Sequence, residues 1–263
     1  MLLEEKVAVV YGAGGVIGAA VAHAFAAEGA RVFLAGRTAP RLRSVAEEIG
    51  RDGGTAQVAQ VDALDEAAVE SHLASIVSSA GRVDISFNAI SHGDVHGAPL
   101  LEMSYDDFAR PVLTAIRTQF VTTKAAAHHM KARGSGVIIS ITATTSRQSI
   151  PEVGGTGVAF DAMESLSRQW AAELGPYGIR VVWLLTTGIP EALHGGDSLQ
   201  PGYGTAPAMT REQLIAWMSG KTLMNRLTTL EDVGRAAAWI ASDAAQAMTA
   251  AAINLTYGAI PGR

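Results

Sequence analysis

The sequence predicts a single α/β domain, in which helices cover both faces of a parallel sheet, and three observations support this fold class. Short apolar runs alternate along the chain with longer segments of helical periodicity, as expected for repeated strand–helix–strand units. Most runs are almost continuously apolar, which is typical of parallel strands buried on both sides. The 263 residues fit one large domain, and neither a linker nor an internal repeat divides it. We therefore expect one domain over 1–263.

Each predicted element follows from its local pattern. The apolar runs that predict strands are 6–12, 31–36, 56–62, 83–88, 136–142, 179–185 and 251–258. The helical patterns cover 17–28, 39–50, 65–80, 104–132, 156–174 and 230–242. Because strands and helices alternate strictly, the sequence predicts a doubly wound sheet of about seven parallel strands.

The predicted helix 156–174 follows a glycine-rich turn and ends at Gly175-Pro176, where proline cannot continue a helix. A four-residue spacing predicts that its inward face consists of Ala162, Leu166, Trp170 and Leu174. Thr156 and Phe160 begin this helix, and neither is a strong acid, base or nucleophile.

The longest segment without regular periodicity is 186–209, directly after the predicted strand 179–185. Long irregular segments often close binding sites, and ligands of doubly wound sheets bind beyond the carboxyl ends of the strands. We therefore expect a substrate lid within 186–220. The apolar residues that favour a small, mainly apolar substrate are Leu100, Leu101, Met209 and Trp217.

Composition excludes several classes of protein. The chain has no cysteine, so it forms no disulfide and no thiolate metal site, and we expect no metal. A net charge of -5 with interspersed acids and bases gives no basic stripe for nucleic acid. No apolar run approaches the roughly 18 residues of a membrane span, and the acidic N-terminus is unlike a signal peptide. We expect a cytoplasmic protein.

The segment VVYGAGGVIGAA (9–20) places glycines between the first strand and the first helix. Glycine lets the backbone approach a pyrophosphate, and a helix N-terminus supplies amide donors. The segment resembles the G-x-x-x-G-x-G turn of the short-chain dehydrogenase/reductase family, in which Gly12 and Gly18 match and Val16 replaces the middle glycine.

The resemblance spans nearly the whole chain. The other segments that carry it are VFLAGRTAPRL, VDALD, FNAI, AAELGPYGIRV and LTTLEDVGRAAAWIASDAAQAMTA. It implies a Rossmann-type fold, a nicotinamide cofactor and oxidoreductase activity on a small carbonyl or alcohol. It also implies a homodimer or homotetramer, formed through the long helices at 104–132 and 156–174.

The predicted second strand ends at Gly36-Arg37, where an acid would favour NAD(H) and an arginine suits the 2′-phosphate of NADP(H). We favour NADP(H) over NAD(H), and the absence of any cofactor is the third alternative, because Val16 and Ile90 replace family glycines. The resemblance implies cofactor contacts from Gly12, Gly15, Val16, Ile17, Gly18, Arg37, Asp62, Ala63, Asn88 and Ile189.

The family usually works through an Asn-Ser-Tyr-Lys set, in which tyrosine exchanges the proton. Counting from the matching motifs places Ala115, Ala143, Thr156 and Phe160 at these four positions. Tyrosine ordinarily titrates near a pKa of about 10, and threonine is a far weaker acid. We therefore do not expect the usual mechanism, and the resemblance is to a divergent member.

Other acids and bases lie near the predicted site. The segment SHGDVHGAP (91–99) follows the fourth predicted strand at the carboxyl edge of the sheet and contains His92, Asp94 and His96. A histidine exchanges protons near neutral pH, and a neighbouring carboxylate can orient it. Arg147 and Glu152 should also face the mouth of the site.

Three functions fit the sequence. The first is an NADP(H)-dependent oxidoreductase that uses a proton donor other than tyrosine. The second is a catalytically inactive subunit that binds a ligand or a partner through the same fold. The third is a non-redox enzyme, such as a dehydratase, isomerase or cyclase, that uses the pocket without hydride transfer.

Overall fold

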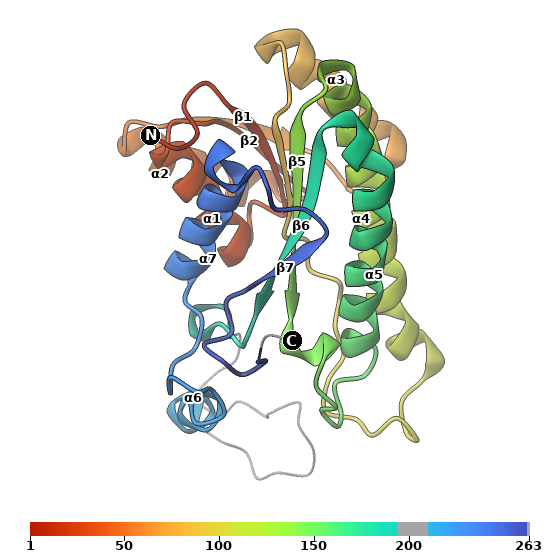
Figure 1. The fold of residues 1–263 in the computed structure, drawn as a ribbon. Helices are drawn as coiled ribbons and strands as arrows, with labels where there is room; N and C mark the ends of the chain where they lie inside the picture. Colours follow the sequence, from red (N-terminus) through yellow and green to blue (C-terminus); the bar gives the residue numbers. More distant parts are fainter. Residues whose placement is uncertain (194–209, 262–263) are drawn as a thin grey trace.

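A computed structural model of the chain, which describes residues 1–193 and 210–261, shows one parallel sheet of seven strands (Figure 1). The strand order is β3-β2-β1-β4-β5-β6-β7. The strands are β1 (Val7–Tyr11), β2 (Arg31–Gly36), β3 (Thr55–Gln60), β4 (Ile85–Asn88), β5 (Gly136–Ala143), β6 (Ile179–Thr186) and β7 (Ala251–Asn254). The predicted fold class is confirmed, and each predicted run overlaps one strand.

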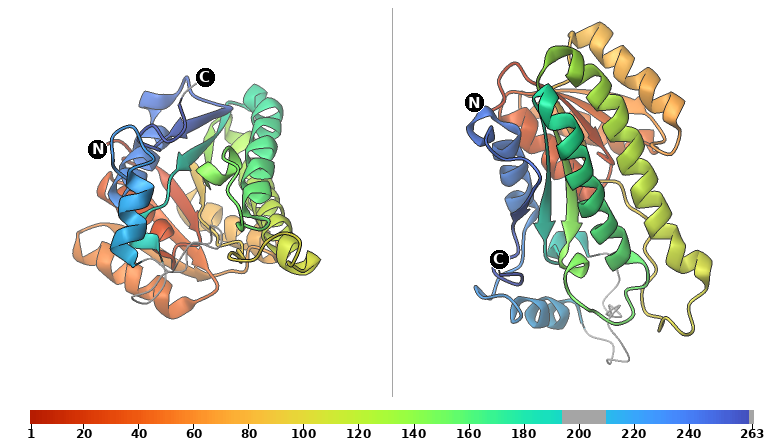
Figure 2. Two further views of the ribbon diagram at one scale, coloured as in Figure 1. Left: turned by 90° about the horizontal axis from the view of Figure 1, so that it is seen from below. Right: turned by 45° about the vertical axis from the view of Figure 1, so that its right-hand side comes forward.

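Helices cover both faces of the sheet (Figures 1 and 2). One core joins the sheet to α1, α2 and α7, and a second joins its opposite face to α3, α4 and α5. The helices are α1 (Val16–Ala27), α2 (Ala39–Arg51), α3 (Glu66–Ala80), α4 (Tyr105–Arg133), α5 (Thr156–Leu174), α6 (Arg211–Ser219) and α7 (Leu230–Ala241).

The strand order reverses between β1 and β4, which are parallel neighbours joined in register at Tyr11 and Asn88. From β1 the chain first builds outward to β2 and β3, and then returns to β4 on the other side. The connections that follow β1 and β4 therefore diverge to opposite faces and leave a crevice at the carboxyl edge of the sheet, where such folds bind ligands.

The sequence did not predict helix α6. Its residues follow the irregular segment 186–209 and fall within the expected lid, 186–220. Thr210 caps it, since its side chain accepts from the backbone N–H of Gln213 and the Gln213 side chain accepts in return from the N–H of Thr210. This capping box is visible in the sequence as a threonine followed three residues later by glutamine. Residues 194–209 of the expected lid lie outside the described residues, and Met209 is among them.

The inward face of α5 differs from the predicted one. Its buried side chains include Ala159, Met163, Ser167 and Ala171, whereas Ala162, Leu166 and Trp170 are only half-buried. The helix packs against both the sheet and α4, and small residues permit this close approach. Trp170 lies at the edge of that interface, with its ring 5.4 Å from the ring of Phe120 on α4. The prediction therefore rotated the helix by about a quarter of a turn.

Two further observations concern membrane-spanning helices and metal sites. Among the described helices, none combines the length and the apolar character needed to span a membrane. In the same part of the chain, no three histidine, aspartate or glutamate side chains are arranged so that they could hold a metal ion.

Candidate active site

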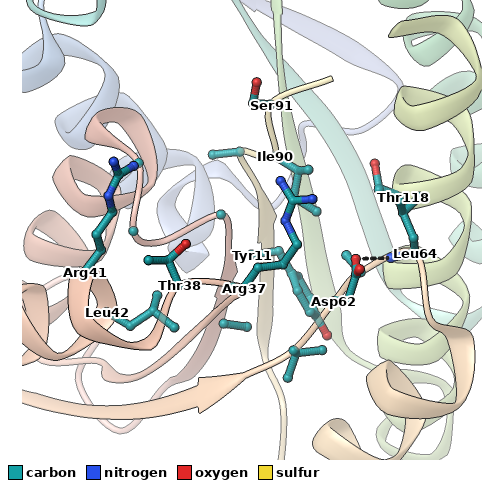
Figure 3. Close-up of a pocket in the computed structure, with 18 of the residues that line it drawn as sticks. Tyr11, Arg37, Thr38, Arg41, Leu42, Asp62, Leu64, Ile90, Ser91 and Thr118 are labelled. Atoms are coloured by element: carbon teal, nitrogen blue, oxygen red, sulfur yellow. Dashed lines mark hydrogen bonds between the residues drawn. The ribbon is translucent and has the colours of Figure 1, made fainter. Parts of the chain in front are cut away.

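A cavity of about 220 Å³ lies at the reversal of strand order, and we call it the switch-point cavity (Figure 3). It is bounded by the ends of β1, β2 and β4, by the segment after β3 and by the start of α2. The predicted site residues that line it are Gly12, Gly15, Arg37, Asp62 and Ala63, and Ile90 also lines it.

Two glycines, one in the turn before α1 and one in the first turn of α1, leave no room for a side chain. Gly12 has a φ of 76°, which favours glycine, and a Cβ there would overlap the carbonyl of Ala89. A Cβ on Gly18 would overlap the carbonyl of Gly12. Gly15 differs, because its Cβ would lie 3.4 Å from the nearest atom, the oxygen of Gly12. Gly12 and Gly18 therefore allow α1 to pack directly against the end of β4.

The amino end of α1 is open to an anion. Gly15 caps it without a side-chain hydrogen bond, and its first turn carries no acid, so its amide donors remain free. Val16, which replaces the middle glycine, begins the helix with its side chain 38% exposed. Ile17 instead packs against the core. The branched side chain at Val16 therefore leaves the turn intact.

Two arginines line the switch-point cavity, Arg37 after β2 and Arg41 in the first turn of α2 (Figure 3). Within residues 1–193 and 210–261, neither guanidinium group forms a hydrogen bond or an ion pair. Asp62 is engaged differently, since its Oδ1 accepts from the backbone N–H of Leu64 at 3.0 Å. The cavity thus presents two unpaired cations beside a fixed carboxylate.

A second region contains all three predicted substitutes, and we call it the α5 corner: residues 91–97, the first turns of α5 and the 3₁₀ turn η1 (Thr144–Ser146). Thr156 is buried, and its Oγ1 lies 3.0 Å from Oδ1 of Asp94 and 2.8 Å from Nε2 of His96. A carboxylate only accepts, so the threonine donates its single proton to Asp94. This pattern assigns a proton to Nε2 of His96, which donates to Thr156.

His92 packs against Phe160, with ring centroids 5.6 Å apart in an edge-to-face arrangement. It is 6% exposed. Burial lowers the pKa of its imidazole, while the charge of Asp94 acts in the opposite direction. The ring therefore favours the neutral form beside an apolar partner. Residues 91–97 thus contact both positions at which the family resemblance placed tyrosine and lysine.

Backbone contacts close the α5 corner further. The N–H of Gly97 donates to the carbonyl of Glu152 at 2.9 Å, and Glu152 has a φ of 60°, which is unusual for a residue with a side chain. A Cβ on Gly154 would lie 2.6 Å from the carbonyl oxygen of Val95. Glycine before α5 therefore lets the segment 91–97 lie directly on the start of that helix.

The remaining predicted positions are dispersed. Ala115 is buried where α4 packs on α5, next to Ala159 and Met163. Ala143 ends β5, Asn88 ends β4 and donates to Thr122 at 3.1 Å, and Ile189 is buried after β6. Beyond the site proper, Leu100 and Leu101 are exposed, and Trp217 lies on α6 below the ammonium group of Lys221.

The sequence analysis missed Glu164, which is buried and binds Arg147. Arg147, predicted to face the mouth of the site, instead lies against this carboxylate. The sequence contained a pattern that could have identified Glu164. Thr156, Phe160 and Glu164 are spaced by four residues and therefore share one face of α5.

Comparisons with known proteins identify the family. A family model described as enoyl-(acyl carrier protein) reductase matches residues 12–259. Secoisolariciresinol dehydrogenase of Forsythia intermedia is 31% identical over 248 residues, which cover 93% of this chain and 85% of that protein. L-rhamnose 1-dehydrogenase (NAD(P)(+)) of Azotobacter vinelandii is 30% identical over 268 residues, which cover 98% of each protein.

Solved structures share the fold. NAD+-bound xylitol dehydrogenase superposes with a TM-score of 0.88 at 24% identity, covering 97% of this chain and 99% of that one. A dehydrogenase/reductase from Sinorhizobium meliloti superposes with a TM-score of 0.81 at 27% identity, covering 98% and 96%.

Proposed function

Because the chain belongs to the short-chain dehydrogenase/reductase family, we propose that it is an NADP(H)-dependent oxidoreductase that interconverts a small carbonyl compound and its alcohol. One observation carries the chemistry that is particular to this chain: the hydrogen-bonded set of Asp94, Thr156 and His96 in the α5 corner. In this set a histidine binds Thr156, the residue at which the family resemblance implies a tyrosine.

The switch-point cavity fits the adenosine half of the cofactor. The turn at Gly12 leaves no room for a side chain, and the free amides of α1 suit a pyrophosphate. The two unpaired guanidinium groups of Arg37 and Arg41 suit the dianionic 2′-phosphate, which favours NADP(H) over NAD(H). When bound, the nicotinamide group supplies the hydride for carbonyl reduction and accepts it in alcohol oxidation.

The residues of the α5 corner handle the proton. In reduction, the carbonyl carbon gains a hydride and its oxygen takes the hydroxyl proton of Thr156, which turns from Asp94 toward the substrate. The threonine oxygen takes the Nε2 proton of a protonated His96, which becomes a neutral imidazole. His96 is exposed, so it recovers its proton from solvent. Asp94 orients the Thr156 hydroxyl before the substrate binds, and oxidation runs in reverse.

A homodimer or homotetramer is part of the proposal. The long helices α4 and α5 expose four large hydrophobic side chains, Tyr105, Leu113, Phe120 and Val158, although isolated apolar side chains also occur on monomers. Sedimentation velocity at micromolar concentration measures the assembly, and a single monomer peak would refute this part.

The proposed activity is tested in a single turnover with NADPH and an aromatic diketone, phenanthrenequinone. We expect NADPH oxidation by the wild-type protein. His96→Gln keeps an N–H for Thr156 but cannot exchange a proton. The rate should fall by about a hundredfold or more, and NADPH affinity should stay unchanged.

Two results would overturn the proposal. Wild-type protein that binds NADPH but transfers no hydride across a panel of carbonyl compounds would be a binding subunit. A His96→Gln variant that keeps the wild-type rate and pH profile would place the proton donor elsewhere.

A further inference from the structure

Glu164 is a carboxylate in an unusual place, since it is 2% exposed on the sheet-facing side of α5. Its Oε1 accepts from the hydroxyls of Thr142 at 3.2 Å and Ser146 at 2.8 Å. Its Oε2 accepts from Nη2 of Arg147 at 2.8 Å. Every donor comes from β5 or from the segment that follows it, so this side chain joins α5 to that segment.

Stability alone does not explain this carboxylate. A buried charge is costly to desolvate, and a well-packed apolar side chain of similar volume is often as stable. Arg147 compensates only in part, because its side chain is 38% exposed and solvent screens the pair. The carboxylate instead fixes the orientation of its neighbours, because its two oxygens accept hydrogen bonds from three donor side chains at once.

The segment held by Glu164 is η1, which bounds the α5 corner. Ser146 shares its one proton between Glu164 and the carbonyl of Ala143. The carbonyl oxygen of Thr145 lies so close to α5 that a Cβ on Gly157 would be 2.7 Å from it. Gly157 follows Thr156 directly. The position of η1 therefore sets one wall beside the Thr156 hydroxyl.

The hydroxyls of this segment divide into two groups. Those of Thr142 and Ser146 are committed to Glu164, whereas the Oγ1 of Thr145 is buried with no partner among the described residues. Other buried hydroxyls of the described chain, among them those of Ser140 and Ser167, share this state, so it is the contacts with Glu164 that distinguish this segment.

We propose that Glu164 is a positioning residue that locks η1 against the first turn of α5 and so fixes the substrate-facing wall beside Thr156. The inference rests on the proposed function for the meaning of that wall. The lock itself is a property of the chain and can be measured without turnover.

Hydrogen exchange of the intact protein tests the lock, because the amides of Arg147 and Gln148 both donate to the carbonyl of Thr144 in η1. Glu164→Met removes all three acceptor contacts at similar volume. Exchange over 144–148 should become about tenfold faster, and the rest of α5, the melting temperature and NADPH affinity should stay unchanged. Glu164→Gln retains one acceptor oxygen and should be intermediate.

Turnover gives the second measurement. With phenanthrenequinone, KM should rise about tenfold in Glu164→Met and recover in part in Glu164→Gln, while kcat changes less. Unchanged exchange over 144–148 in Glu164→Met would overturn the lock. Faster exchange spread over all of α5 and β5, with a lower melting temperature, would reduce Glu164 to general stability. Absence of hydride transfer in the wild type would overturn the proposed function and leave the lock standing.

Discussion

The switch-point cavity and the α5 corner lie at the same edge of the sheet, yet they satisfy their polar groups in different ways. The cavity leaves Arg37 and Arg41 unpaired and the first amides of α1 uncapped. In the corner, the Thr156 hydroxyl already binds both Asp94 and His96. Polar groups without partners can bind a ligand directly, whereas paired groups must first break an existing hydrogen bond before they bind a ligand.

The two regions also differ in their backbone. The cavity keeps the glycines that its turn requires, and Val16 leaves that turn intact. In the corner, the Thr156 hydroxyl is held by Asp94 and His96, so the segment 91–97 lies directly on the start of α5.

The largest expected effect tests the corner. Thr156→Val keeps the shape but removes both hydrogen bonds, so reduction of phenanthrenequinone should slow by about a hundredfold to ten-thousandfold. Thr156→Ser retains the hydroxyl and serves as the control, with a rate within about tenfold of the wild type. The measurement is the single-turnover rate, and a Thr156→Val variant as fast as wild type would contradict the relay.

The next effect tests the wall behind the cavity, where Tyr11 meets His72. Both are buried, and the Tyr11 hydroxyl and both His72 ring nitrogens have no partner within the described chain. Burial lowers the pKa of His72 to about 4, from an ordinary value of about 6.5. The unfolded chain therefore binds the proton more readily, and folding stability falls as pH drops from about 6.5 to about 4, by about 3 kcal/mol.

Replacing His72 by leucine should remove this acid sensitivity. Urea unfolding at several pH values measures it, and His128→Gln, on the exposed side of α4, is the control that should keep the wild-type slope. An unchanged pH slope in His72→Leu would assign the acid sensitivity to other groups.

The smallest effect tests the cavity. Arg37→Ala removes one charged partner of the 2′-phosphate and should weaken NADPH binding by about tenfold to a hundredfold, while NADH affinity changes little. Arg43→Ala is the matched control, because Arg43 lies exposed on the same helix as Arg41 but does not line the cavity. Calorimetric titration measures both. Equal losses for NADPH and NADH would argue against recognition of the phosphate.

Much of the molecule could be predicted from the chain alone. Continuous apolar runs identified most of the strands, because a parallel strand buried on both faces leaves little room for polar residues, whereas the edge strand β3 is mostly exposed. The last predicted strand was too long, since Asn254 accepts from the N–H and hydroxyl of Thr256 and turns the chain there. The sequence also proposed His92, Asp94 and His96 as candidates, because they follow a strand at the edge where ligands bind, and their catalytic role stays a prediction.

The sequence by itself determined the order of strands and helices, the glycine turn before α1 and the absence of a Tyr-x-x-x-Lys pair between 140 and 180, since these depend on local pattern and residue identity. Only the tertiary structure decided that residues 91–97 bind the start of α5, 60 positions further along the chain, and that Glu164 faces η1. A loop has no periodicity from which a side-chain direction can be read, and the rotation of a helix depends on the shapes packed around it. The partner of each polar group is therefore fixed only when the chain has folded.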